Sequence, residues 1–139
     1  MPNYEIPEKL PEDFVEWANI VMGEILGSPN YKDPSKRFYG KLTTSKIRRF
    51  LSLVIDILNE ERIRTQDELK PESVRKLMMA RVRFAYEAAR VDDVRRFVDV
   101  SGIMLYIKDI GKSREKFIAF AEYMEALVAW HRYYGGKEN

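Results

Sequence analysis

The sequence contains no cysteine, a single histidine and no hydrophobic run long enough to cross a membrane. The absence of cysteine excludes a disulfide framework, a thiolate nucleophile and a cysteine-based zinc site. The first residues, MPNYEIPEKLPEDF, lack the basic start and the apolar run of a signal peptide. A chain of 139 residues fits one domain with a modest core. We therefore expect one domain over residues 1–139, a cytoplasmic location and no membrane partner.

Residues that could build a catalytic centre are also scarce. The single histidine, His131, continues an apolar helical stripe, so we expect it to be packed and hydrogen-bonded rather than catalytic. Glu122 and Glu125 are paired carboxylates, but a di-iron bundle needs Glu-x-x-His motifs and position 128 is Val128. A helical RNase of the HEPN type places arginine four to six residues before its catalytic histidine, and that window contains none. We predict no enzymatic activity, no cofactor and no metal.

Apolar residues recur at helical spacing along most of the chain, and no segment shows the sustained alternation of a strand. Residues 27–41, with two prolines and two glycines, instead indicate a long loop. Helices are expected to begin near Pro11, Thr43, Pro71, Asp92 and Ser113. The sequence therefore predicts an all-α fold, a single compact bundle of about five helices with a long loop between the first two.

The charges are unevenly distributed along the chain. Residues 1–26 contain six acidic residues and one lysine, whereas residues 27–49 contain seven basic residues and one aspartate. Within LTTSKIRRF, the residues Lys46, Arg48 and Arg49 fall in the first turns of a helix, where acidic side chains are normally favoured. No acid stands at the positions where it could pair with either arginine within that helix. The cations are either solvated or available to an anion from another molecule.

A second basic row follows the helix predicted from Pro71. Lys76, Arg83 and Arg90 recur every seven residues over about 20 Å, and Tyr86 lies beside them. Cations next to an aromatic ring suit a nucleic-acid backbone with stacked bases, although a basic helix face also serves solubility. Arg81 falls inside the predicted apolar side of this helix, so we expect it to have a carboxylate or carbonyl partner, or else to line a groove.

Aromatic residues gather on the last predicted helix. Tyr123, Trp130 and Tyr134 lie along one flank, next to a core side that includes Phe117 and Phe120. Such residues could stack bases, but at helical spacing they more often fill a core or a subunit interface.

Three motifs together resemble a known family. LTTSKIRRF, VRFAYEAAR and EKFIAFAEYMEALVAWHRYYGG, in this order between residues 42 and 136, are similar to the small subunit of type III-A CRISPR interference complexes, the Csm small subunit. Residues 1–41, the acidic first helix and the basic loop, lie outside this resemblance.

The resemblance implies a non-catalytic all-α subunit. It implies that several copies stack along the complex, beside the backbone subunits that carry the crRNA and beneath the large polymerase-like subunit, and line the path of the target RNA. The expected partners are therefore target RNA or the crRNA–target duplex, the other Csm subunits, and further copies of this chain through stacking or dimerisation. It assigns RNA contacts to Arg48, Arg49, Arg83 and Arg90, and the charge patterns above add Lys46 and Lys76. Recognition is then expected to be independent of RNA sequence, because crRNA pairing reads the sequence.

The charge pattern also fits a helical scaffold or adaptor whose basic face binds an acidic protein. High salt would weaken either interaction, whereas competition by RNA would separate the two.

Overall fold

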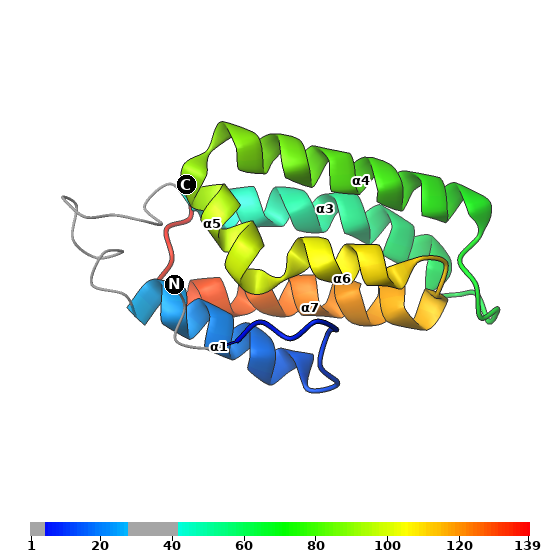
Figure 1. Cartoon of the computed structure of the whole chain (residues 1–139), viewed down its shortest axis with the longest axis horizontal. Helices are drawn as coiled ribbons and strands as arrows, with labels where there is room; N and C mark the ends of the chain where they lie inside the picture. The colour runs from blue at the N-terminus through cyan, green and yellow to red at the C-terminus, as the bar shows by residue number, and fades with distance from the viewer. Residues whose placement is uncertain (1–4, 28–41) are drawn as a thin grey trace.

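The computed structural model describes residues 5–27 and 42–139 (Figure 1). These residues form six helices and no strand, which confirms the all-α prediction with one helix more than the five expected. The helices are α1 (Phe14–Gly27), α3 (Thr44–Glu61), α4 (Pro71–Arg90), α5 (Asp92–Ser101), α6 (Ile103–Ile110) and α7 (Arg114–Tyr133). Nearly all of the loop predicted over 27–41 lies outside the described residues.

The additional helix arises at Gly102, where one predicted helix is divided into α5 and α6. Gly102 adopts a left-handed conformation with φ of 74°, which ends α5 and turns the chain into α6. A Cβ atom at this position would also lie 2.8 Å from the ring of Tyr106. Glycine is therefore required for both the backbone conformation and the close packing.

The long helix α7 forms the centre of the bundle (Figure 1). It packs against α1, α3 and α6, and the apolar side chains of all six helices join one hydrophobic cluster. Helix α4 packs on α3 and α5 and forms one edge of the bundle. One long face of α4 is therefore left without a covering helix among the described residues.

Helix boundaries follow local capping chemistry. Thr43 caps α3 and Ser113 caps α7, because each hydroxyl accepts a hydrogen bond from a backbone N–H three residues later, at 3.2 Å. Helix α4 begins at Pro71, as predicted. The first helix begins later than expected, because Asp13 accepts a hydrogen bond from the backbone N–H of Glu16.

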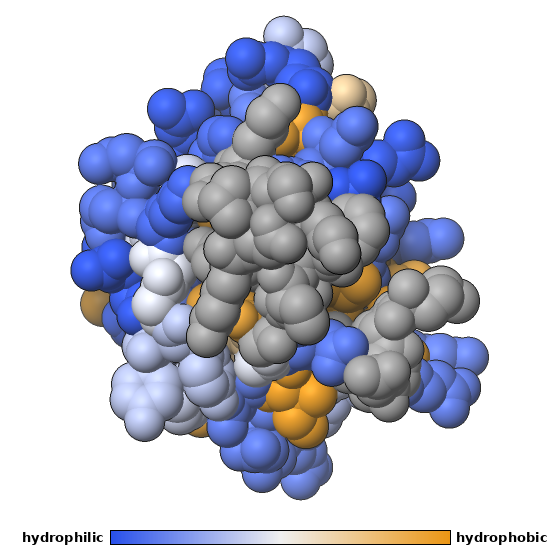
Figure 2. Space-filling view, turned by 90° about the vertical axis from the view of Figure 1, so that its left-hand side faces the viewer, coloured by the Kyte–Doolittle hydropathy of each residue, from blue (hydrophilic) through white to orange (hydrophobic). Residues whose placement is uncertain are grey.

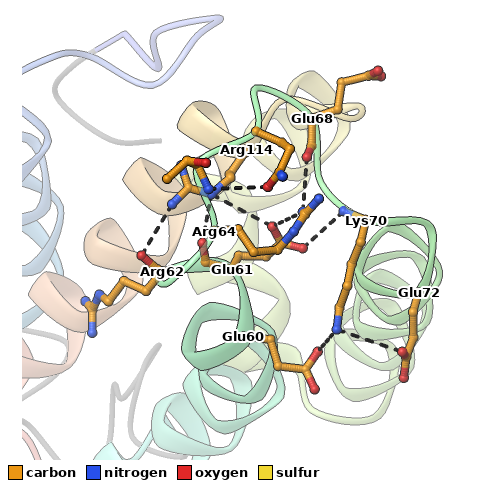
Figure 3. Close-up of polar contacts among 10 residues, drawn as sticks. Glu60, Glu61, Arg62, Arg64, Glu68, Lys70, Glu72 and Arg114 are labelled. Carbon is orange, nitrogen blue, oxygen red and sulfur yellow. Dashed lines mark hydrogen bonds and ion pairs between the residues drawn. The ribbon is translucent and has the colours of Figure 1, made fainter.

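A buried carboxylate joins the end of α3 to the start of α7 (Figure 3). Glu61 is fully buried, and its carboxylate lies 2.5 Å from the guanidinium of Arg64 and 3.1 Å from the backbone nitrogen of Lys70. Arg114 donates to the Glu61 carbonyl oxygen at 2.7 Å. The connection between α3 and α4 is thereby held against the first turn of α7.

Among the described residues, no helix is long and apolar enough to span a membrane.

Candidate nucleic-acid interface

The N-terminus of α3, where three of the predicted contact residues lie, is covered by the end of the described chain. The backbone N–H groups of Thr44 and Ser45 donate to the carbonyl oxygens of Lys137 and Glu138, at 2.7 and 3.0 Å. The Ser45 hydroxyl donates to the same Glu138 oxygen at 2.6 Å. These contacts satisfy donors that the first turn of a helix otherwise leaves exposed.

Arg48 has an acidic partner that the sequence did not indicate, although both side chains of the pair are exposed. Its guanidinium lies 2.6 Å from the carboxylate of Glu138, which also lies 3.2 Å from Arg132. Ninety residues separate Arg48 from Glu138 in the sequence, so helical spacing gives no sign of the pair. Lys46 lies half-buried in the same first turn.

Arg49 and Arg83 come together where α3 packs on α4. Both line a hollow of about 330 Å³ whose wall includes Tyr86. The rings of Phe50 and Phe84 set the distance between the helices, with centroids 4.7 Å apart. Arg49 and Arg83 are exposed, and neither forms an ion pair with any residue that the structure describes. The structure therefore places two of the predicted arginines, from separate sequence motifs, around one cavity.

The other two residues of the predicted α4 row have acidic partners. Lys76 lies 3.4 Å from Glu72 and 3.9 Å from Glu60, and Arg90 lies 3.2 Å from Glu87. All of these side chains are partly exposed, and surface pairs of this kind contribute little free energy. Lys76 and Arg90 thus remain accessible to a competing anion.

Arg75 is a candidate contact that the sequence prediction missed. It lines a second hollow, of about 520 Å³, which Arg83 shares. Arg75 is exposed and makes no ion pair within the described part of the chain. The sequence signal was its position beside Lys76, but only the packing of α3 on α4 shows that it faces the same groove.

Arg81 is not buried within the apolar side of α4, and of the two alternatives given for it the structure shows the groove-lining one. The buried side of α4 is the narrower set Ser73, Leu77, Ala80, Phe84 and Ala88. Arg81 is exposed and lines a separate hollow of about 260 Å³ with Lys108 and Lys112, and it has no ion-pair partner among the described residues.

His131 is packed and hydrogen-bonded, as predicted. It is fully buried, with Nε2 3.3 Å from the carbonyl oxygen of Leu42 and Nδ1 2.8 Å from the Thr44 hydroxyl. Because a carbonyl oxygen only accepts, the hydrogen between His131 and Leu42 is on Nε2. The Thr44 hydroxyl has one hydrogen, which lies within reach of both Nδ1 and the Lys137 carbonyl oxygen, 3.1 Å away. Burial lowers the pKa of His131 to about 4, since the charged ring would lose its water.

The three aromatic residues of the predicted flank contact neighbouring parts of the bundle, and Tyr123 alone among them is buried. Tyr123 is fully buried and donates to the carbonyl oxygen of Ser101 at 2.7 Å. Trp130 donates to the carbonyl oxygen of Val15 at 3.2 Å, and the Tyr134 hydroxyl pairs with the side chain of Asn19. These contacts tie α7 to α5 and α1.

The end of the bundle at which α3 begins and α4 and α7 end is mainly hydrophilic over the surface that Figure 2 colours. Among the described residues, no group of three or more His, Asp and Glu side chains could hold a metal ion. The fold and this surface define a small all-helical protein in which two neighbouring helices present cations around a shared groove.

Comparison with known proteins identifies the family. A sequence model described as Csm2 Type III-A matches residues 32–137. The CRISPR system Cms protein Csm2 of Streptococcus thermophilus is 36% identical over 124 residues, covering 82% of this chain and 98% of that protein. The protein of the same name from Mycobacterium tuberculosis (strain CDC 1551 / Oshkosh) is 30% identical over 129 residues, covering 93% and 97%.

The chain therefore belongs to the Csm2 type III-A family, and it is a small subunit of a type III-A Csm complex. This confirms the resemblance drawn from the three motifs. The match begins at residue 32, ten residues before the first of those motifs, and the Mycobacterium relative extends into the first 41 residues.

Proposed function

We propose that this subunit binds the backbone of target RNA, or of the crRNA–target duplex, without sequence specificity, as a non-catalytic part of the complex. Several copies stack along the RNA beside the backbone subunits and beneath the large polymerase-like subunit. The observation that carries the proposal is the meeting of Arg49, Arg75 and Arg83 around adjoining hollows of the α3–α4 groove. None of the three has an ion-pair partner among the described residues.

Guanidinium groups on two rigid helices can contact successive phosphates without reading base edges. Each phosphate that is neutralised releases counterions, so affinity falls steeply as salt rises. One subunit offers few such contacts. Copies that share one RNA gain affinity because every contact after the first is effectively intramolecular.

The direct test is fluorescence anisotropy of a labelled unstructured RNA of about 40 nucleotides, titrated across a salt series. The variant Arg49→Ala/Arg83→Ala should bind more weakly, and its slope of log affinity against log salt should be less negative by about 1.4, since two contacts are lost. The control Arg62→Ala/Lys112→Ala removes the same charge outside the two hollows and should keep the wild-type slope. Equal slopes for all three proteins would show that Arg49 and Arg83 do not contact RNA phosphates.

The pair between Arg48 and Glu138 gives a separate prediction. Glu138→Gln removes the carboxylate while leaving the backbone carbonyl that accepts from α3, so Arg48 becomes available to a phosphate. RNA affinity at low salt should rise, and the salt slope should become more negative by about 0.7.

The same titration contains the control for this effect. Adding Arg48→Ala to Glu138→Gln should abolish the part of the gain that comes from Arg48, although Arg132, the other partner of Glu138, is also released. An equal gain in both variants would assign the effect to Arg132 or to the loss of a repulsive charge at Glu138, and not to Arg48.

A further inference from the structure

Helix α4 exposes large apolar side chains next to its cations. The side chains of Met79, Val82 and Tyr86 are 56%, 58% and 62% exposed. Their spacing of three and four residues places them on successive turns of one face. Single exposed apolar residues are common on protein surfaces, but several on one face mark a place where a partner removes water.

Two of these three side chains, Met79 and Tyr86, line the groove between α3 and α4. Met79 and Arg83 line the larger hollow together with Leu53 of α3, and Tyr86, Arg83 and Leu53 line the smaller one. Arg83 lies four residues after Met79 and three before Tyr86, so its guanidinium stands between two apolar surfaces. The groove thus offers apolar area and positive charge at the same point.

The ring of Tyr86 is oriented by its neighbour. The guanidinium carbon of Arg90 lies 5.6 Å from the ring centroid, within the range of a cation–π interaction. Arg90 is itself held by Glu87 at 3.2 Å. One face of an exposed aromatic ring is therefore supported, as in a stacking platform.

An RNA duplex offers no exposed base face to these apolar side chains. In a duplex the bases are stacked on one another, and a protein that contacts only phosphates needs cations without adjacent apolar side chains. An unpaired nucleotide presents a flat apolar base directly beside its phosphate. That combination matches Tyr86 flanked by Arg83 and Arg49.

We propose that Tyr86 stacks an unpaired RNA base while Arg83 and Arg49 hold the neighbouring phosphates. This inference rests on the proposed RNA binding and narrows its ligand to RNA that exposes at least one base at this groove. An acidic amphipathic protein segment would also satisfy apolar and positive groups, and the experiment below separates the two.

The experiment compares three labelled RNAs at low salt with the full chain: an unstructured single strand, the same strand fully paired with its complement, and the same strand with abasic sites. Tyr86→Ala should weaken binding of the single strand about 5- to 100-fold, the range expected for loss of one stacked base. It should leave the duplex and the abasic strand within about twofold of the wild type. Tyr86→Phe keeps the ring and should bind all three RNAs as the wild type does.

Other outcomes overturn the inference in distinguishable ways. If Tyr86→Ala weakens all three RNAs equally, Tyr86 contacts the backbone and no base is stacked. If Tyr86→Ala has no effect while Arg49→Ala/Arg83→Ala makes the slope of log affinity against log salt less negative, the proposed phosphate contacts are supported and the proposed base contact is wrong. If the wild type binds none of the RNAs, the proposed function fails together with the inference. If Tyr86→Ala keeps RNA binding but loses binding to another Csm subunit, the exposed apolar residues Met79, Val82 and Tyr86 form a protein contact instead.

Discussion

Replacing Glu61 with alanine is expected to lower the free energy of unfolding by about 3 kcal/mol, because removing one partner of a buried ion pair leaves the other charge buried and unpaired. The carboxylate is fully buried and binds Arg64 and the backbone N–H of Lys70 (Figure 3). Its removal leaves the largely buried guanidinium groups of Arg64 and Arg114 without their acid. Chemical denaturation followed by helical circular dichroism measures the change.

The matched control is Glu125→Ala, which removes an exposed carboxylate 3.8 Å from Arg62. That surface pair should contribute less than about 1 kcal/mol. A similar loss in both variants would mean that the buried network does not stabilise the junction of α3, α4 and α7.

The effect of Glu61 should also depend on pH. Burial alone would raise its pKa, but the Arg64 guanidinium and the Lys70 N–H, which both donate to the carboxylate, favour the charged form, and the pKa is lowered overall. Because the pKa of Glu61 is lower in the folded than in the unfolded chain, its ionised carboxylate stabilises the fold fully above the unfolded pKa. This contribution is lost as pH falls through the folded pKa. The difference between wild type and Glu61→Ala should therefore be larger at pH 7 than at pH 3.

Much of the fold followed from local patterns in the sequence. For the helix beginning near Thr43, hydrophobic spacing predicts a buried stripe of Ile47, Phe50, Leu51, Val54 and Leu58, because an amphipathic helix must bury one face. All but Leu51, which is partly buried, are buried in α3. The caps at Thr43 and Ser113 and the start at Pro71 were also correct, since they depend only on adjacent residues. The division at Gly102 was missed because a glycine within a periodic pattern need not break a helix.

The candidate site was less predictable because its properties depend on contacts between distant segments. The meeting of Arg49 with Arg83 requires the packing of α3 on α4, and the pairing of Arg48 with Glu138 joins residues ninety positions apart. The predicted apolar side of α4, which consisted of Val74, Leu77, Met78, Phe84, Ala85 and Ala88, was wider than the buried side that the structure shows. Met78 is 64% exposed, because α3, α5 and α6 cover this edge helix on fewer sides than a central helix is covered.

A second large effect is expected at His131, the only histidine in the sequence. Its pKa is about 4 in the folded protein against an ordinary value of 6.5. Because the unfolded chain binds a proton more readily, stability is complete above pH 6.5 and is lost as pH falls toward 4. These two values predict a loss of about 2 kcal/mol between pH 7 and pH 5.

The comparison that isolates this effect uses His131→Gln over the same pH range. The variant should be less stable at pH 7, since Leu42 and Thr44 lose a fitted partner, but its stability should change little between pH 7 and pH 5. An equal pH dependence in wild type and variant would assign the loss to carboxylates instead.

The position of His131 extends this argument to the RNA surface. Its ring is hydrogen-bonded to the Thr44 hydroxyl, and the backbone nitrogen of Thr44 in turn donates to the Lys137 carbonyl oxygen. Gly136 packs so closely on the ring that a Cβ atom there would collide with it. Charging the ring in mild acid should therefore loosen the chain end that holds Glu138 beside Arg48 before the whole bundle unfolds. If so, protection of the Thr44 and Ser45 amides from hydrogen exchange, corrected for intrinsic rate, should fall between pH 7 and pH 5 in the wild type and remain constant in His131→Gln. Unchanged protection in the wild type would show that the chain end is held by its backbone hydrogen bonds alone.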